Sequence, residues 1–214
     1  MASHGHSHSH GGGGGSHGHD CSKETVDSFE TESLFGCIDV ERVRCLNEED
    51  EGSVKDIFKP HERRLDKTKF VQSDVDEQLI IYIPFTGSVK VASIVIVGDG
   101  DTCPKNVDIW VDRNDIDFDS AEDIKPAQRL ELQPDPRAEL EYHLSPLKFS
   151  SVSSITLFVS ENFGDDQTRI YHIGLRGQFL KVRRELGELV YELAPNPKDH
   201  KVEGSSYGAT QNIF

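Results

Sequence analysis

The sequence predicts an all-β domain whose strands are mainly antiparallel and form a sandwich or a barrel. About eight short runs rich in Val, Ile, Leu and aromatic residues follow one another between residues 79 and 182, roughly 8 to 20 residues apart. Little helical periodicity separates these runs. Parallel strands need crossover helices, so antiparallel pairing is the expected arrangement.

Large apolar side chains are concentrated in the middle of the 214-residue chain. Residues 1–32 and 194–214 hold few of them and cannot bury enough surface to offset chain entropy. We therefore expect a disordered head at 1–32, one folded domain at 33–193, and a polar, disordered tail at 194–214.

The expected elements begin with LFGCIDVERVRCLNE, a short helix or turn in which Ile38, Val43 and Leu46 recur at roughly helical spacing. LIIYI (79–83) is a strand, which Pro84 ends or confines to a sheet edge. TGS (86–88) is then a turn. VKVASIVIV (89–97) is apolar on both faces toward its end, which favours a central strand.

GDGDTCPK (98–105) is expected to be a loop because Gly and Pro interrupt it. Further strands are expected at NVDIWVD (106–112), RLELQ (129–133), RAELEYHL (137–144) and VSSITLFVS (152–160). TRIYHIGLRGQFLKV (168–182) is one long strand, or two strands around Gly174 and Gly177.

The formal net charge of −15 disfavours direct binding to nucleic acid, which depends on Lys and Arg. The basic segment KPHERRLDKTK (59–69) is interpreted as a solvated loop. No apolar run reaches the roughly 18 residues of a membrane span, and no signal peptide is visible. We expect a soluble, reduced, intracellular monomer that binds neither nucleic acid nor membranes.

The acidic cluster Asp74, Asp76 and Glu77 stands directly before the strand at 79–83. Catalytic carboxylates need a cleft and a partner base or nucleophile, and neither is visible in the sequence. Asp is favoured in turns because its carboxylate accepts backbone N–H groups. The cluster is therefore predicted to be structural.

Other candidate motifs are weak. GSSYG (204–208) has the G-x-S-x-G spacing around Ser206, but polar residues replace the strand and helix that a nucleophile elbow needs. DIDFDS (115–120) lacks the Gly and Glu of a calcium-binding EF-hand; a different loop calcium site stays open. The histidine-rich head can chelate metal ions but offers no fixed geometry, so it is interpreted as a solvated segment.

Single His and Cys residues in the expected domain also give no site. His143 and His172 lie in expected strands and are predicted to be packed and hydrogen-bonded. The cysteines form no C-x-x-C pair, and those in the expected domain, at positions 37, 45 and 103, are interpreted as small buried hydrophobes. No catalytic residue, cofactor ligand or metal ligand is assigned.

Three segments resemble the PITH domain, the C-terminal module of proteasome-interacting thioredoxin-like proteins. They are VRCLNE (43–48), SDVDEQLIIYIPF (73–85) and ITLFVSENFGDDQTRIYHIGLRG (155–177). The IPFTG segment, the ending formed by 162–164 and 171–177, and the His/Gly-rich head are similar to stand-alone PITH proteins. The resemblance covers residues 33–193 and implies a galactose-binding-like jelly roll. The thioredoxin half and its C-x-x-C motif are absent, so redox activity does not carry over.

The resemblance also implies association with the 26S proteasome regulatory particle, in the cytoplasm and nucleus. We therefore expect a non-catalytic adaptor, with no cofactor, that presents loops such as 74–77 and 115–119 to a protein partner. The alternatives are an adaptor outside the proteasome, or a jelly roll that binds sugar or calcium at a loop pocket beside an aromatic such as Trp110. A metal-handling head and an enzyme rank below these.

Overall fold

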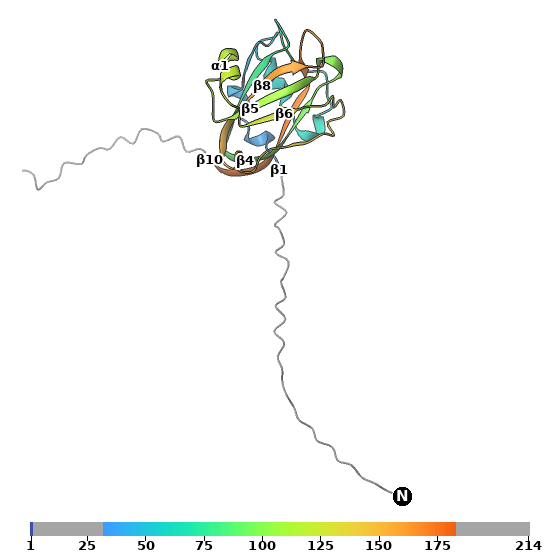
Figure 1. Cartoon of the computed structure of the whole chain (residues 1–214), viewed down its shortest axis with the longest axis vertical. Helices are drawn as coiled ribbons and strands as arrows, with labels where there is room; N and C mark the ends of the chain where they lie inside the picture. The colour runs from blue at the N-terminus through green and yellow to red at the C-terminus, as the bar shows by residue number, and fades with distance from the viewer. Residues whose placement is uncertain (2–31, 183–214) are drawn as a thin grey trace, which may run out of the picture. The chain divides into compact units, whose positions relative to one another are not determined.

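A computed structural model of the protein describes residues 32–182 and Met1. The strands are β1 (Glu32–Ser33), β2 (Arg44–Leu46), β3 (Val71–Gln72), β4 (Leu79–Val97), β5 (Pro104–Val111), β6 (Gln128–Glu131), β7 (Tyr142–His143), β8 (Val152–Asn162), β9 (Arg169–Ile170) and β10 (His172–Val182) (Figure 1). The helices are α1 (Phe118–Asp123) and the short 3-10 helices η1 (Phe35–Cys37), η2 (Val40–Arg42), η3 (Ser53–Ile57), η4 (His61–Arg63) and η5 (Gly100–Thr102).

All strand pairs of the described residues are antiparallel, which confirms the predicted class. The first half of β4 lies between β2 and β8, and β5 and β6 continue that layer. The second half of β4 lies between β10 and β7, and β1 pairs with the outer edge of β10. The buried apolar cluster takes side chains from β4, β8 and β10, as expected between the layers of a sandwich. The predicted disordered head and tail lie outside the described residues, apart from Met1 and residue 32.

Strand β4 is longer than predicted. The prediction placed a turn at 86–88 between two strands, whereas the structure has one strand of 19 residues. Its register with β8 is interrupted between Pro84 and Val89, where β4 changes partners. The predicted turn was wrong because a bend with a register shift accommodates a proline without ending the strand. The central position of 89–97 is confirmed, since β10 and β7 flank it.

A β-bulge explains why residues 89–97 are apolar on both faces. The core-facing positions are odd-numbered up to Val91 and even-numbered from Ile94. The pairing of β4 with β10 shifts register between Val91 and Ser93, so Ala92 has no partner residue on β10. A Cβ on Gly177, opposite the bulge, would lie 1.9 Å from the backbone oxygen of Lys90. Only glycine permits this approach of the two strands.

Three other segments differ from their predictions. The segment expected to be one helix or turn near residues 34–48 forms η1, η2 and β2; Ile38 and Val43 are buried, whereas Leu46 is half-exposed. The run at 137–144 contributes only the short strand β7. The run at 168–182 divides at Tyr171 into β9 and β10, and not around its glycines.

Helix α1 was not predicted, and it covers the outer face of the layer that contains β5 and β8. A second apolar cluster joins Ile80, Trp110 and Phe158 to Ile116 and Ala121. Trp110 is 2% exposed, and its Nε1 donates to the carbonyl oxygen of Ile124 at 3.1 Å. Trp110 is therefore a core residue and cannot be the exposed aromatic expected by the sugar-binding alternative. None of the helices in the described residues is long and apolar enough to cross a membrane.

Candidate functional site

The segments on which the family resemblance rests meet at one end of the domain. The N–H of Asp74 donates to the backbone oxygen of Asn47 at 3.0 Å, and the N–H of Glu49 donates to that of Gln72 at 2.9 Å. The segment after β8 joins them, because Ser73 N–H donates to the carbonyl oxygen of Thr168 at 3.0 Å. The segments 47–49, 72–78 and 161–168 thus form one surface, which we call the acidic end.

Asn47 holds the acidic loop 74–78 in place. Its backbone is left-handed, with φ of 68°, a conformation that asparagine tolerates better than most residues. Its Nδ2 donates to Asp76 Oδ1 at 2.8 Å and to the backbone oxygen of Gln78 at 2.7 Å. Its Oδ1 accepts from the N–H of Val75 at 3.1 Å. One side-chain amide therefore fixes both sides of the loop tip.

Thr168 and Gln167 hold the same loop from the opposite side. Thr168 Oγ1 donates to the backbone oxygen of Glu77 at 2.6 Å, and its N–H donates to Ser73 Oγ at 2.9 Å. Gln167 Nε2 donates to the backbone oxygen of Asp74 at 3.2 Å. The sequence alone did not indicate these contacts, because residues 91 to 95 positions apart make them.

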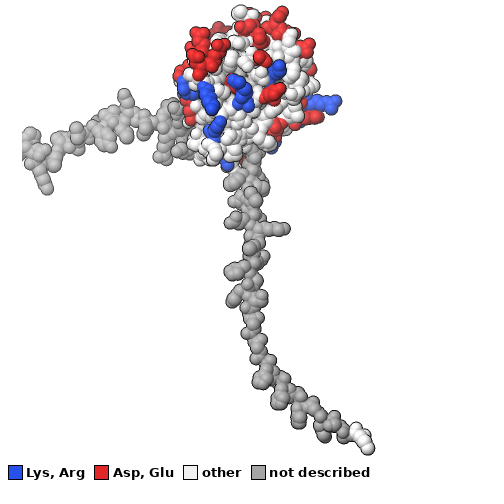
Figure 2. Space-filling model, in the orientation of Figure 1, with Lys and Arg blue, Asp and Glu red and all other residues white. Residues whose placement is uncertain are grey.

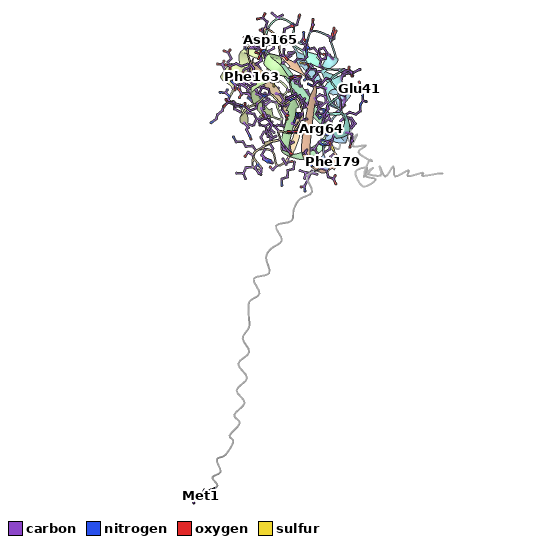
Figure 3. The ribbon with its side chains drawn as sticks, turned by 90° about the vertical axis from the view of Figure 1, so that its right-hand side faces the viewer. Met1, Glu41, Arg64, Phe163, Asp165 and Phe179 are labelled. Atoms are coloured by element: carbon purple, nitrogen blue, oxygen red, sulfur yellow. The ribbon has the colours of Figure 1, made fainter. Side chains whose placement is uncertain are left out.

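The acidic end surrounds a shallow hollow at whose rim Val75 stands 82% exposed. The hollow is lined by Val75, Asp76, Glu77, Glu161, Asn162, Gly164, Asp165 and Asp166. Asp76 Oδ1 also accepts from the N–H of Gln78 at 3.0 Å, which confirms the predicted structural role for this carboxylate. Figure 3 shows Asp165 and Phe163 at the top of the domain, away from Arg64 and Phe179.

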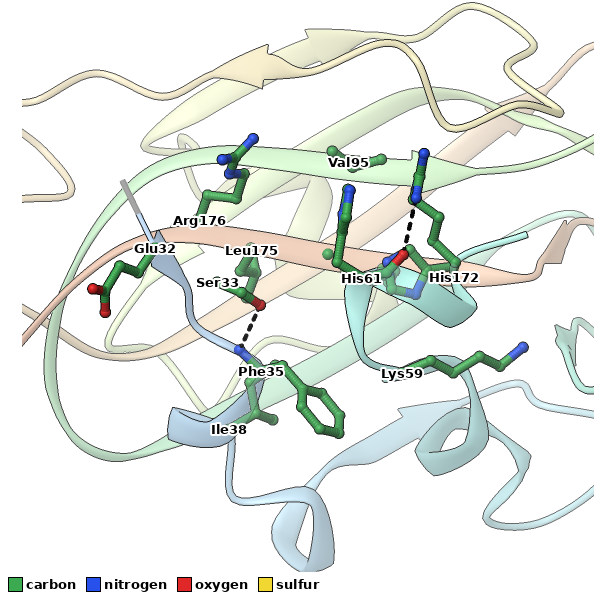
Figure 4. A pocket seen from close by; sticks show the side chains of 13 residues that line it. Glu32, Ser33, Phe35, Ile38, Lys59, His61, Val95, His172, Leu175 and Arg176 are labelled. Carbon is green, nitrogen blue, oxygen red and sulfur yellow. Dashed lines mark hydrogen bonds between the residues drawn. The ribbon is translucent and has the colours of Figure 1, made fainter. Parts of the chain in front are cut away.

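A second hollow, of opposite charge, lies beside β10. β1 pairs with only a short part of this strand, and Leu34 N–H adds one bond to the Leu175 oxygen. The segment 32–38 on one side and residues 59–64 on the other enclose a cavity of about 310 Å³ (Figure 4). We call it the cationic cavity because Lys59, His61, Arg64, His172 and Arg176 line it together with Glu32. Its apolar lining comes from Phe35, Ile38, Val95, Ile173 and Leu175.

Lys59 shows that the interpretation of 59–69 as a solvated loop was partly wrong. Lys59 is 7% exposed, and its Nζ donates to the backbone oxygens of Asp66 (2.6 Å), Lys69 (2.9 Å) and Tyr171 (3.1 Å). Burial lowers the pKa of its ammonium. The rest of the segment is largely exposed, but this one side chain fastens it to the start of β10.

His172 is buried, as predicted, whereas His143 is exposed on the short strand β7. The Nδ1 of His172 lies 3.2 Å from the carbonyl oxygen of Ile57, and this oxygen can only accept. The pKa of His172 is lowered to about 4, mainly by burial; the charges of Lys59, His61 and Arg64 contribute to the lowering, and the hydrogen bond to Ile57 opposes it. The ring is therefore neutral at pH 7 and protonated on Nδ1.

Arg64 has an unusual hydrogen-bonding pattern. Its Nη1 donates to the carbonyl oxygen of His61 at 3.1 Å. Its Nε is buried and has no hydrogen-bond partner among the described residues. An unsatisfied buried donor is uncommon and costly in native structures, which makes the Nε of Arg64 a candidate contact for a ligand or a water.

The remaining predicted candidates do not join either hollow. Asp115 forms a two-bond pair with Arg113, and Asp117 caps α1 by accepting from the N–H of Ser120 at 2.8 Å. On the face shown in Figure 2, carboxylates gather over α1 and the loops at the top, and Lys and Arg lie across the middle. Residues 204–208 and the histidine-rich head lie outside the described residues. Across 32–182, no three His, Cys, Asp or Glu side chains converge in a way that could hold a metal ion.

The cysteines of the domain resemble one another in their low reactivity. Cys103 is buried, as expected, while Cys37 and Cys45 are only partly buried. Burial raises the pKa of all three thiols, that of Cys103 to about 11. A nucleophilic cysteine needs a lowered pKa, so none of the three is activated.

Comparisons with known proteins agree with the resemblance seen in the sequence. The PITH domain family matches residues 24–195. A PITH domain-containing protein of Drosophila pseudoobscura pseudoobscura is 46% identical over 196 residues, which cover 86% of this chain and 92% of the relative. PITH domain-containing protein 1 of Homo sapiens is 43% identical over 199 residues, which cover 87% and 94%.

Among solved structures, the CBM32-1 and CBM32-2 domains of Clostridium perfringens ZmpB, in complex with GalNAc, are similar with a TM-score of 0.53. The identity is 10%, and the match covers 70% of this chain and 37% of that chain. At this identity the similarity shows the fold alone, which is the predicted galactose-binding-like jelly roll. With a family match over most of its length and relatives above 40% identity, the chain belongs to the PITH domain family.

Proposed function

We propose that the protein is a non-catalytic interaction module that binds a protein partner through the acidic end. The observation that carries this proposal is the position of Val75. This apolar side chain is 82% exposed, yet its loop is fixed by Asn47 and Thr168. An exposed apolar residue on a fixed loop, beside a cluster of carboxylates, suits a partner that offers an apolar contact next to basic side chains.

The shape of the acidic end favours a macromolecular partner over a small substrate. The hollow is shallow, and Asp76 already accepts hydrogen bonds from Asn47 and Gln78. Loops held on a rigid sheet are a common protein-binding arrangement. The loop 115–119, expected to share this role, is occupied by the Arg113 pair and the cap of α1, so 74–78 and 161–166 are the favoured contact residues.

The partner that the family resemblance suggests is the regulatory particle of the 26S proteasome, in the cytoplasm and nucleus. The test is a pull-down of purified 26S proteasome by the full chain at low and high salt. Binding should weaken at high salt because surface charges are screened. Val75→Ser should reduce affinity about fivefold, which corresponds to about 1 kcal/mol.

Leu147→Ser is the matched control. Leu147 is also an exposed apolar residue, at 91%, and it follows β7 instead of belonging to the acidic end. This variant should bind like the wild type. Equal loss in both variants, or no capture of proteasome at either salt concentration, would remove the proposal.

A further inference from the structure

The guanidinium groups of this domain show how Arg64 could be completed. Arg113 donates from Nε and Nη2 to the two carboxylate oxygens of Asp115 at 2.7 and 2.8 Å. Arg129 uses the same two nitrogens toward Asp108, at 2.6 Å each. In Arg64 the Nη1 is occupied by His61 and the buried Nε has no partner among the described residues. The edge of Arg64 that carries this Nε is the same edge that binds carboxylates in Arg113 and Arg129.

The surroundings of Arg64 favour an anion. Lys59, Arg64 and Arg176 carry positive charge at the cavity, and Glu32 is the one carboxylate among its described lining residues. Arg176 already contacts Glu141 at 3.3 Å, and the three hydrogen bonds of Lys59 described above go to backbone oxygens. Lys59 therefore contributes its charge to the cavity, and Arg64 contributes a directional donor.

The apolar lining limits the ligand further. Phe35 and Ile38 come from the segment after β1, and Val95 lies on β4 (Figure 4). A cavity of about 310 Å³ lies at the small end of the range for small-molecule sites, roughly 300–1,000 Å³. A free inorganic ion would leave this apolar surface uncovered, whereas an anion joined to an aromatic or aliphatic body would cover it.

We propose that the cationic cavity binds a small organic anion. Its planar or tetrahedral oxygen-bearing head accepts from Nε and Nη2 of Arg64, next to His61, and its apolar body packs on Phe35, Ile38 and Val95. The ligand class is an aryl or alkyl carboxylate or phosphate. This site shares no residue with the acidic end, so it adds a second binding activity to the one proposed above.

The test titrates the full chain with 3-phenylpropionate, phenyl phosphate and the neutral 3-phenylpropionamide, and follows binding by NMR and calorimetry. We expect at least one of the two anions to saturate with a millimolar Kd or better, and the amide not to bind. Shifted signals should include Phe35 and Val95. Binding by the carboxylate, by the phosphate or by both then identifies the head group.

Variants of Arg64 test the donor itself. Arg64→Ala should weaken anion binding about tenfold or more, and Arg64→Lys, which keeps the charge but loses the two-nitrogen edge, should recover only part of it. Arg113→Ala removes an exposed arginine outside the cavity and should leave binding unchanged. Melting temperatures check that each variant is folded. Equal binding of the amide, equal binding by Arg64→Ala, or no saturation by either anion up to about 10 mM would overturn the proposal.

Discussion

The acidic end and the cationic cavity use similar anchors to build opposite surfaces. At the acidic end, Asn47 satisfies the backbone of a loop and leaves an apolar tip exposed. At the cavity, Lys59 donates to three backbone oxygens, and the neighbouring Arg64 has a buried Nε without a partner among residues 32–182. The two sites differ less in their number of charges than in whether their polar groups already have hydrogen-bond partners. The satisfied, shallow surface suits a protein, and the unsatisfied, enclosed one suits a small ligand.

The largest expected effect comes from breaking the close approach of β4 and β10 at the bulge, next to the cavity residue Arg176. In Gly177→Ala the new Cβ would meet the Lys90 oxygen at 1.9 Å, so β10 and β4 must separate. We expect the free energy of unfolding to fall by about 3 kcal/mol or more, measured by urea denaturation. Gly36→Ala is the control, because a Cβ there meets nothing within 4 Å. Similar stability of Gly177→Ala and Gly36→Ala would contradict the close approach.

Replacing Lys59, which holds segment 59–69 beside the cavity, should have the next largest effect on the free energy of unfolding. Lys59→Met keeps the length of the side chain but leaves three backbone oxygens without their donor. We expect a loss of about 3 kcal/mol in the free energy of unfolding. Lys55→Met removes a more exposed lysine whose Nζ lies 3.4 Å from Glu41, and it should cost less than about 1 kcal/mol. Equal losses would mean that the buried bonds of Lys59 contribute little.

The buried histidine should make stability depend on pH. The pKa of His172 is lowered to about 4 in the folded state, against about 6.5 in an unfolded chain. The unfolded state therefore binds the extra proton first, and stability falls as pH drops from about 6.5 toward 4. The loss should reach about 2.5 kcal/mol across this window, since one pKa unit corresponds to about 1.4 kcal/mol.

Denaturation at pH 7.0 and 4.5 measures this effect. His172→Gln should show a smaller difference between the two pH values, while His143→Gln, at an exposed position, should behave like the wild type. An unchanged pH profile in His172→Gln would assign the loss to other groups.

The smallest stability effect is expected at the acidic end. Asn47→Ala loses the side-chain clamp and places alanine at a positive φ, which should cost about 2 kcal/mol. Asn47→Gly loses the clamp but relieves the backbone, so it should cost about 1 kcal/mol. Both variants should bind proteasome more weakly than the wild type and bind the organic anions equally well. Loss of anion binding in both would show that the two surfaces are not independent.

Local patterns in the sequence were enough to predict most of the long strands but not the sites. The apolar runs at 106–112 and 152–160 correspond to β5 and β8, since their burial follows from composition. Pro84 was interpreted as a strand end or an edge position because a local rule cannot foresee a strand that changes partners. Polar and apolar residues alternate along segment 137–144 as in a strand, yet the segment forms a loop and only the short strand β7.

The candidate site needed tertiary information. Lys59 looked like one solvated lysine among several basic residues, and its burial depends on Tyr171, 112 positions away. Asn47 belongs to a recognisable motif, but its clamp on 74–78 joins residues 28 to 31 positions apart. The acidic cluster was correctly given a structural role at Asp76. The cationic cavity gave no sequence signal, because residues from four separate segments line it.

The continuity of β4 has a consequence for how the protein opens. One strand takes part in both layers, so neither layer can lose its ladder without disturbing the other. Amide protons of β8 and β10 should therefore exchange with deuterium at matching, slow rates, as members of a single cooperative unit. Thermal fluctuations would then release the short flanking ladders, such as β3 with β9, long before the central hydrogen bonds open.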